Sequence, residues 1–150
     1  MTGGSRYCTG GWSTMRLCND TITVVNAAYD SATDLDVFIP TVLNGCSWFL
    51  RDNAAVEPSG LKNASTVVVR IPADNPKSGM YVDPIAYAAL SDKSGHWTLQ
   101  AGDIIVKAAV TGTDLRPQAL AAAYPDVITV LSVTDNRRAP KEPHWKVTGA

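Results

Sequence analysis

From Asp20 onward the pattern of hydrophobic and polar positions is mostly strand-like, with short β-branched runs separated by polar turns. Thr21–Asn26, Thr66–Ile71 and Val127–Thr134 each predict a strand. Val37–Arg51 contains further strand-like runs. The Asn44-Gly45 pair inside this segment predicts either a tight turn or a bulge within one long strand.

Two shorter apolar runs, His96–Leu99 and Ile104–Val110, flank a tight polar turn and predict a β-hairpin. His144–Thr148 predicts a last short strand. Met80–Leu90 is ambiguous, because Pro84 would interrupt a strand and the residues after it suit a short helix or an edge strand equally well.

One segment is clearly helical, namely Leu115–Tyr124. Thr113 or Asp114 is placed to cap it, Pro117 is tolerated in its first turn, and Pro125 ends it. About six or seven short strands and one helix near 115–124 predict a mainly β fold, a small β-barrel or sandwich.

The first residues of the chain differ from the rest in composition and in hydrophobic pattern. Met1–Thr14 is rich in glycine and has no periodic apolar pattern, which predicts a flexible arm before a single domain at residues 15–150. One hypothesis makes Met15 the functional start, and another makes the leader an ordered extension used for contacts between subunits.

Composition narrows the class of protein. The chain has 150 residues, of which 45% are hydrophobic and 18% charged, with a net charge of −1. This suits one globular domain and argues against a dedicated nucleic-acid binder or a basic membrane-surface protein. The three cysteines and two histidines have no zinc-ligand spacing, so neither a disulfide framework nor a metal site is expected.

Two loops are predicted between the strands. Asp52–Ser65 is a loop by composition, and its length is typical of a functional loop or of one that a partner orders. Ala73–Gly79 is a second, turn-rich loop.

The aspartates are better placed to cap turns than to act in catalysis. Asp34 with Asp36 and Asp83 with Asp103 are the pairs that could serve acid–base catalysis. Each of them stands beside Gly, Pro, Ser or Thr, where aspartate oxygens commonly cap turns, so a structural role is favoured.

No nucleophile has an evident base. Cys46 lies in an apolar stretch and is expected to be a small buried hydrophobe. His96 and His144 each precede a tryptophan, so in a strand the tryptophan would enter the core while the histidine faces outward. Ser78 followed by Gly79 and Met80 gives only a faint likeness to Ser–Lys peptidases.

A basic and aromatic group lies near the C-terminus. It is predicted as a docking tail or, alternatively, as a phosphate-binding patch of an OB-like barrel or a solvated loop. Its residues are Arg137, Arg138, Lys141, His144 and Trp145.

The order of segments resembles small structural proteins from the morphogenesis region of tailed bacteriophages and prophages. More narrowly, it is similar to the head-closure, or stopper, class of head–tail connector proteins of long-tailed phages. The segments that carry the resemblance are Thr21–Asp30, Val42–Asp52, Thr66–Pro72, Tyr81–Leu90, His96–Val110, Val127–Pro140 and His144–Val147.

The resemblance implies a non-enzymatic β-barrel that forms a closed ring, sixfold or twelvefold, in the virion neck. Its partners would be portal or adaptor proteins above and tail-terminator or tail-tube proteins below, with non-specific contact to packaged DNA, no membrane and no cofactor. The protein would be made in the cytoplasm of the host bacterium. One loop would narrow the DNA channel, and the candidate channel residues are Asp52, Asn53, Val56, Glu57, Pro58, Gly60 and Lys62.

Alternatives stay open at this point. A tail-terminator or an adaptor would occupy the same connector, although adaptors are mostly helical. An OB-like nucleic-acid-binding module would need salt-dependent affinity for DNA. A hydrolase is disfavoured because no nucleophile–base motif is present.

Overall fold

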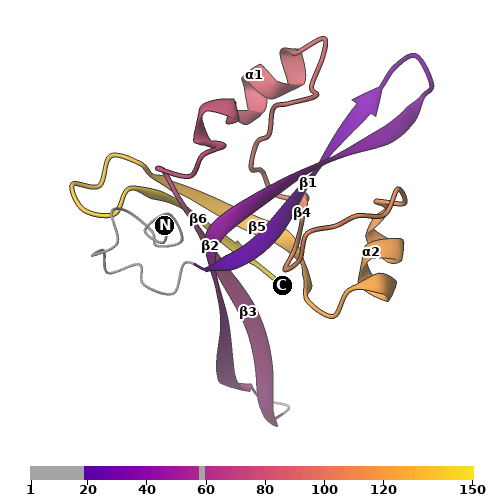
Figure 1. Cartoon of the computed structure of the whole chain (residues 1–150). Helices are drawn as coiled ribbons and strands as arrows, with labels where there is room; N and C mark the ends of the chain where they lie inside the picture. Colours follow the sequence, from indigo (N-terminus) through magenta and orange to yellow (C-terminus); the bar gives the residue numbers. More distant parts are fainter. Residues whose placement is uncertain (1–18, 58–59) are drawn as a thin grey trace.

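A computed structural model describes residues 19–57 and 60–150 of the chain. Antiparallel strands form a closed barrel in the order β1-β2-β3-β6-β5-β4 (Figure 1). This confirms the predicted mainly β fold and selects the barrel over the sandwich. The predicted arm Met1–Thr14 lies outside the described residues. The strands are β1 (Asp20–Asp30), β2 (Leu35–Glu57), β3 (Gly60–Pro72), β4 (Ile104–Val106), β5 (Val127–Asn136) and β6 (His144–Gly149).

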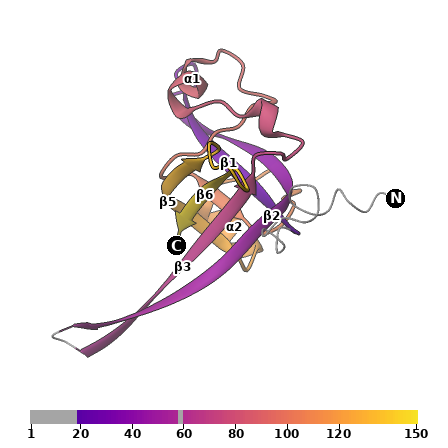
Figure 2. The same ribbon diagram turned by 90° about the vertical axis from the view of Figure 1, so that its left-hand side faces the viewer.

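Strand β2 is the longest element and takes part in two hairpins. Its first half pairs with β1, from Leu35 opposite Asp30 to Cys46 opposite Asp20. Its second half pairs with β3, from Ser47 opposite Arg70 to Glu57 opposite Gly60. The ends of both hairpins leave the barrel as two-stranded ribbons on opposite sides of the molecule (Figures 1 and 2).

The change of partner along β2 coincides with the Asn44-Gly45 pair. Gly45 has a φ of 74°, a conformation that glycine adopts without strain. The β1–β2 register shifts between Asp20 and Ile22, opposite this point. The alternative of a bulge within one long strand is therefore confirmed, and the tight turn is not formed.

The barrel interior is filled by aliphatic side chains and two tryptophans. Trp97 and Trp145 are 0% and 1% exposed, and their ring centres lie 5.2 Å apart in a T-shaped arrangement. Both tryptophans therefore enter the core, as the sequence predicts, while His96 and His144 are half-buried.

Helix α2 (Pro117–Ala123) covers a second apolar cluster on the outside of the barrel. Its Leu120 packs with Val25, Ile104 and Val106, whereas the neighbouring Ile105 points into the barrel. All three residues of β4 are buried because both faces of that strand are covered. The helix confirms the prediction near 115–124. Its predicted cap is wrong, since Arg116 stands at the N-cap and Asp114 instead binds the Arg116 side chain at 2.8 Å.

The ambiguous segment after β3 forms helical structure. Ser78–Met80 is a short 3-10 helix and α1 is Pro84–Ala89. Asp83 caps α1, because its carboxylate accepts a hydrogen bond from the Ala86 amide at 3.0 Å. No helix within the described ranges is both long and apolar enough to cross a membrane.

The predicted hairpin of His96–Leu99 with Ile104–Val110 is wrong. Strand β4 pairs with β1 and β5, and His96–Leu99 forms only an isolated bridge between Trp97 and Tyr81. Hydrogen bonds from a side chain, instead of backbone strand pairing, hold this segment against β1. The amide of buried Asn26 donates to the Thr98 carbonyl at 2.7 Å and to Asp103 at 2.8 Å.

Candidate functional site

The segment predicted as a channel loop, Asp52–Ser65, is a β-ribbon. Its backbone continues the β2–β3 ladder from Asp52 opposite Ser65 to Glu57 opposite Gly60. The loop prediction is wrong because it rests on the intrinsic preference of each residue. In the structure, each residue pair beyond Arg51 extends a strand pairing whose register is already set closer to the barrel. The candidate channel residues Asp52, Asn53, Val56, Glu57, Gly60 and Lys62 lie on this ribbon, and Pro58 lies outside the described residues.

The β2–β3 ribbon has no further strand beside it in the described part of the chain. Strand β6 pairs with β3 only from Val67 to Pro72, and β1 pairs with β2 only as far as Cys46. The ribbon runs away from the barrel (Figure 2), and six extended residues give it a reach of about 20 Å. A two-stranded ribbon is only marginally stable by itself, and its free edges are open to pairing.

The β1–β2 ribbon, at the opposite end, is acidic and apolar. Tyr29, Leu35 and Val37 are 62%, 66% and 41% exposed. The Asp30 carboxylate accepts hydrogen bonds from the Ala32 amide at 3.0 Å and the Thr33 hydroxyl at 3.1 Å, which closes the turn. Asp34 accepts a hydrogen bond from the Tyr29 hydroxyl, so the polar groups of the turn are satisfied locally.

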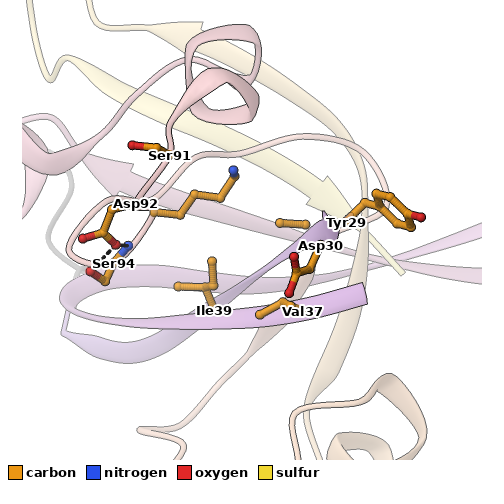
Figure 3. A pocket seen from close by; sticks show the side chains of 9 residues that line it. Tyr29, Asp30, Val37, Ile39, Ser91, Asp92 and Ser94 are labelled. Carbon is orange, nitrogen blue, oxygen red and sulfur yellow. Dashed lines mark hydrogen bonds between the residues drawn. The ribbon is translucent and has the colours of Figure 1, made fainter. Parts of the chain in front are cut away.

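An open cavity of about 350 Å³ lies between this ribbon and the loop that follows α1 (Figure 3). Asp30, Val37 and Ile39 line one side, and Ser91, Asp92 and Ser94 line the other. The Asp92 carboxylate accepts hydrogen bonds from the Ser94 hydroxyl at 2.6 Å and the Ser94 amide at 3.0 Å, and these bonds lower the Asp92 pKa. Because its polar groups already have partners in the loop, the cavity lacks the convergent groups of a small-molecule site.

The second predicted loop, Ala73–Gly79, is held against the barrel. Buried Asn75 donates to the Asn44 carbonyl at 2.6 Å, and the Lys77 ammonium donates to the Val42 carbonyl at 2.6 Å. The Trp97 indole in turn donates to the Lys77 carbonyl at 2.8 Å. These bonds brace the bulge in β2, so the segment does not project as a channel loop would.

The predicted docking tail contains residues with quite different environments. Arg138 and Lys141 are exposed, as a docking role requires. Arg137 is held in place, because its guanidinium lies 2.6 Å from the Asp135 carboxylate and 5.0 Å from the centre of the Trp145 ring. The hydrogen bonds from Arg137 lower the pKa of Asp135.

The prediction that Trp145 belongs to a docking tail is wrong. Its side chain is 1% exposed, so it belongs to the core and cannot serve as a docking residue. His144 is half-buried, with Nδ1 2.7 Å from the Glu142 carbonyl and Nε2 3.3 Å from the Asn136 amide nitrogen. The alternation of a strand buries Trp145 and turns His144 outward, which the dipeptide alone already suggested.

The outer face of the sheet around β3 carries a cationic pair that sequence reasoning missed. Val69 and Val147 point into the core, so their neighbours Arg70 and Lys146 point outward, and the register places these two directly opposite each other. Neither makes an ion pair with a described residue, and Arg70 lies 5.6 Å from the centre of the Phe49 ring. Only the strand register could have revealed this pair, because 76 residues separate its members.

The nucleophile candidates are buried or have other partners. Cys46 is 0% exposed, and burial together with nearby Asp20 raises its thiol pKa to about 12, opposite to the shift that a nucleophile needs. Burial likewise raises the pKa of Tyr87 to about 12. Ser78 lies in a short 3-10 helix, and its amide donates to the Asn75 carbonyl in a local turn.

Three of the four aspartates in the two carboxylate pairs make structural hydrogen bonds, and Asp36 is exposed. Asp83 caps α1, and Asp34 bonds to Tyr29. Asp103 is 2% exposed and accepts hydrogen bonds from the Asn26 side chain and the Ala27 amide. In the part of the chain that is described, no group of three His, Cys, Asp or Glu side chains is placed to hold a metal ion.

The model of a family of unknown function, DUF6751, matches residues 17–150. No curated protein and no solved structure matches the chain.

Proposed function

We propose that this chain, which belongs to the DUF6751 family of unknown function, is a non-enzymatic structural subunit of the neck of a tailed bacteriophage. It would form a ring between the portal–adaptor assembly and the tail and help to close the DNA channel. The proposal combines the resemblance in the order of segments with the geometry of the barrel and its ribbons.

The observation that carries the proposal is the β2–β3 ribbon. A closed barrel has no free sheet edge of its own and makes a rigid ring element. The ribbon beyond Arg51 and Thr66 reaches away from that barrel with both edges unpaired among the described residues. Such a projection contributes little to the barrel itself, and it suits a segment that becomes ordered against neighbours or lies across a channel.

The chemistry of the side chains supports a structural role. Burial raises the pKa values of Cys46 and Tyr87. Asp30 and Asp83 accept hydrogen bonds from backbone amides in a turn and at a helix N-terminus. Among the described residues, no pair of groups is pushed toward opposite acid and base roles, as a hydrolytic site would require.

The alternatives differ in how well they fit this shape. A connector adaptor, mostly helical, fits a barrel less well than a stopper does, and a tail-terminator remains the nearest alternative. An OB-like nucleic-acid module is favoured by one observation, the outward cationic pair Arg70 and Lys146.

The test is a null allele of this gene in the phage or prophage that carries it, with particles viewed by electron microscopy. We expect separate tails and heads that have lost their DNA, and we expect the wild-type gene supplied in trans to restore joined particles. A gene in which Asn-Gly replaces Asp52–Ser65 should fail to restore DNA retention. Complete infectious virions from the null allele would overturn the proposal.

A further inference from the structure

Two charged surfaces of the molecule form no ion pair with other described residues. One is the acidic tip, which we define as Asp30, Asp34 and Asp36 with the exposed Tyr29 and Leu35. The other is the basic face, which we define as Arg51, Arg70 and Lys146 with the half-buried Phe49. Only two ion pairs join described residues, Asp114 with Arg116 and Asp135 with Arg137, and neither involves these surfaces.

The basic face places like charges next to each other, which lowers the stability of the isolated chain. Arg70 and Lys146 are direct cross-strand neighbours, and like charges in such positions are destabilising. Arg51 continues the outward row along β2, two residues beyond Phe49. The acidic tip likewise gathers charges of one sign, here negative, since its three carboxylates lie within seven residues of sequence.

The two surfaces also match in their apolar parts. Leu35 is 66% exposed at the tip. On the basic face, the ring of the half-buried Phe49 lies 5.6 Å from the Arg70 guanidinium. An apolar centre with a charged rim is the usual composition of a protein interface. Along β2, the acidic tip at Leu35 is separated from Phe49 and Arg51 of the basic face by the stretch that pairs with β1, so the two surfaces are distinct. The end of the β1–β2 hairpin, which carries the acidic tip, extends away from the barrel (Figure 1).

We propose that the acidic tip of one copy binds the basic face of a second copy. The contact is head-to-tail, so each copy has one of each surface left for the next, and a suitable rotation closes the series into a ring. The inference rests on the proposed ring and names its contact. Its test uses purified protein, so failure of this contact is distinguishable from absence of the chain from the phage neck.

The experiment is sedimentation velocity of the full chain at low salt and at about 0.5 M salt, where charge attraction is strongly screened. We expect wild-type protein to self-associate at low salt. Asp36→Lys and Lys146→Glu should each weaken association about tenfold or more, because each places like charges against each other. A mixture of the two variants should associate again, since the reversed tip of one then meets the reversed face of the other.

Asp126→Lys and Lys141→Glu, at exposed positions outside both surfaces, are the matched controls and should associate as wild type does. Wild-type protein that stays monomeric at low salt would overturn the inference, as would single variants that associate normally. If Lys146→Glu abolishes binding to duplex DNA while self-association persists, the basic face binds nucleic acid and the inference is wrong.

Discussion

Asn26 and Asp103 are joined inside the barrel wall by a hydrogen bond of 2.8 Å between the Asn26 amide and an Asp103 carboxylate oxygen. Asn26 also holds the backbone of Thr98, through its carbonyl and its amide. This pair attaches the segment before β4 to β1 without any strand pairing. A buried carboxylate with such a role links the stability of the fold to pH.

Burial raises the pKa of Asp103 above the ordinary value of 3.8. The folded chain therefore holds this proton more tightly than the unfolded chain does. The contribution of Asp103 to stability is largest below about pH 4 and falls as the pH rises through the raised pKa. We expect the unfolding free energy of wild type, relative to Asp103→Asn, to decrease over this range in urea titrations at several pH values.

Asp126→Asn is the control for this measurement, because it removes a carboxylate at an exposed position away from Asn26 and Asp103. A difference for Asp103 that instead grew with pH would mean that the hydrogen bonds from Asn26 and Ala27 outweigh burial.

Closure of the barrel depends on Gly149. A Cβ at this position would lie 2.6 Å from the Thr129 carbonyl oxygen and 2.8 Å from Ile128 Cδ1. We expect Gly149→Ala to lower the unfolding free energy by about 1–3 kcal/mol, since the clash involves backbone that cannot move freely. Gly79→Ala is the matched control, because nothing lies within 4 Å of its Cβ position. Equal melting temperatures for the two variants would contradict this close approach of Gly149 on β6 to Ile128 and Thr129 on β5.

Arg137 stabilises the rim of the barrel by lying across two aromatic rings, 5.1 Å from the centre of Tyr81 and 5.0 Å from that of Trp145. We expect Arg137→Ala to cost about 1 kcal/mol in urea unfolding. Arg138→Ala should cost almost nothing, since Arg138 is exposed and makes no such contact. An equal loss for both variants would show that the two arginines act only through net charge.

The β2–β3 ribbon should be dispensable for folding. Replacing Asp52–Ser65 with Asn-Gly removes residues that pair only with each other, and shortening the connection slightly reduces its closure cost. We therefore expect the unfolding free energy to change by less than about 1 kcal/mol, together with an unchanged near-ultraviolet circular dichroism spectrum. Loss of that spectrum would mean that the ribbon supports the core.

Sequence patterns predicted the fold where local and global preferences agree. The β-branched run Val127–Thr134 lies within β5, and the alanine-rich Gln118–Tyr124 largely coincides with α2. The sequence patterns gave wrong predictions where tertiary contacts determine the secondary structure. Asp52–Ser65 has weak strand preference but extends an existing ladder, whereas His96–Leu99 has strong strand preference but is held by the Asn26 side chain instead.

The candidate surfaces were predicted less well than the fold, for a related reason. Trp145 could be placed inside from strand alternation once β6 was assigned, although its basic neighbours suggested a docking tail. The Arg70–Lys146 pair depends on the β3–β6 register, which joins distant parts of the chain and leaves no local sequence signal.

The most direct test of the proposed function is a cryo-electron microscopy map of the intact particle, with this chain fitted to the neck. We expect a closed ring of these barrels between portal and tail, with the β2–β3 ribbons directed toward the channel axis. A neck built entirely from other chains, or this barrel found elsewhere in the particle, would contradict it.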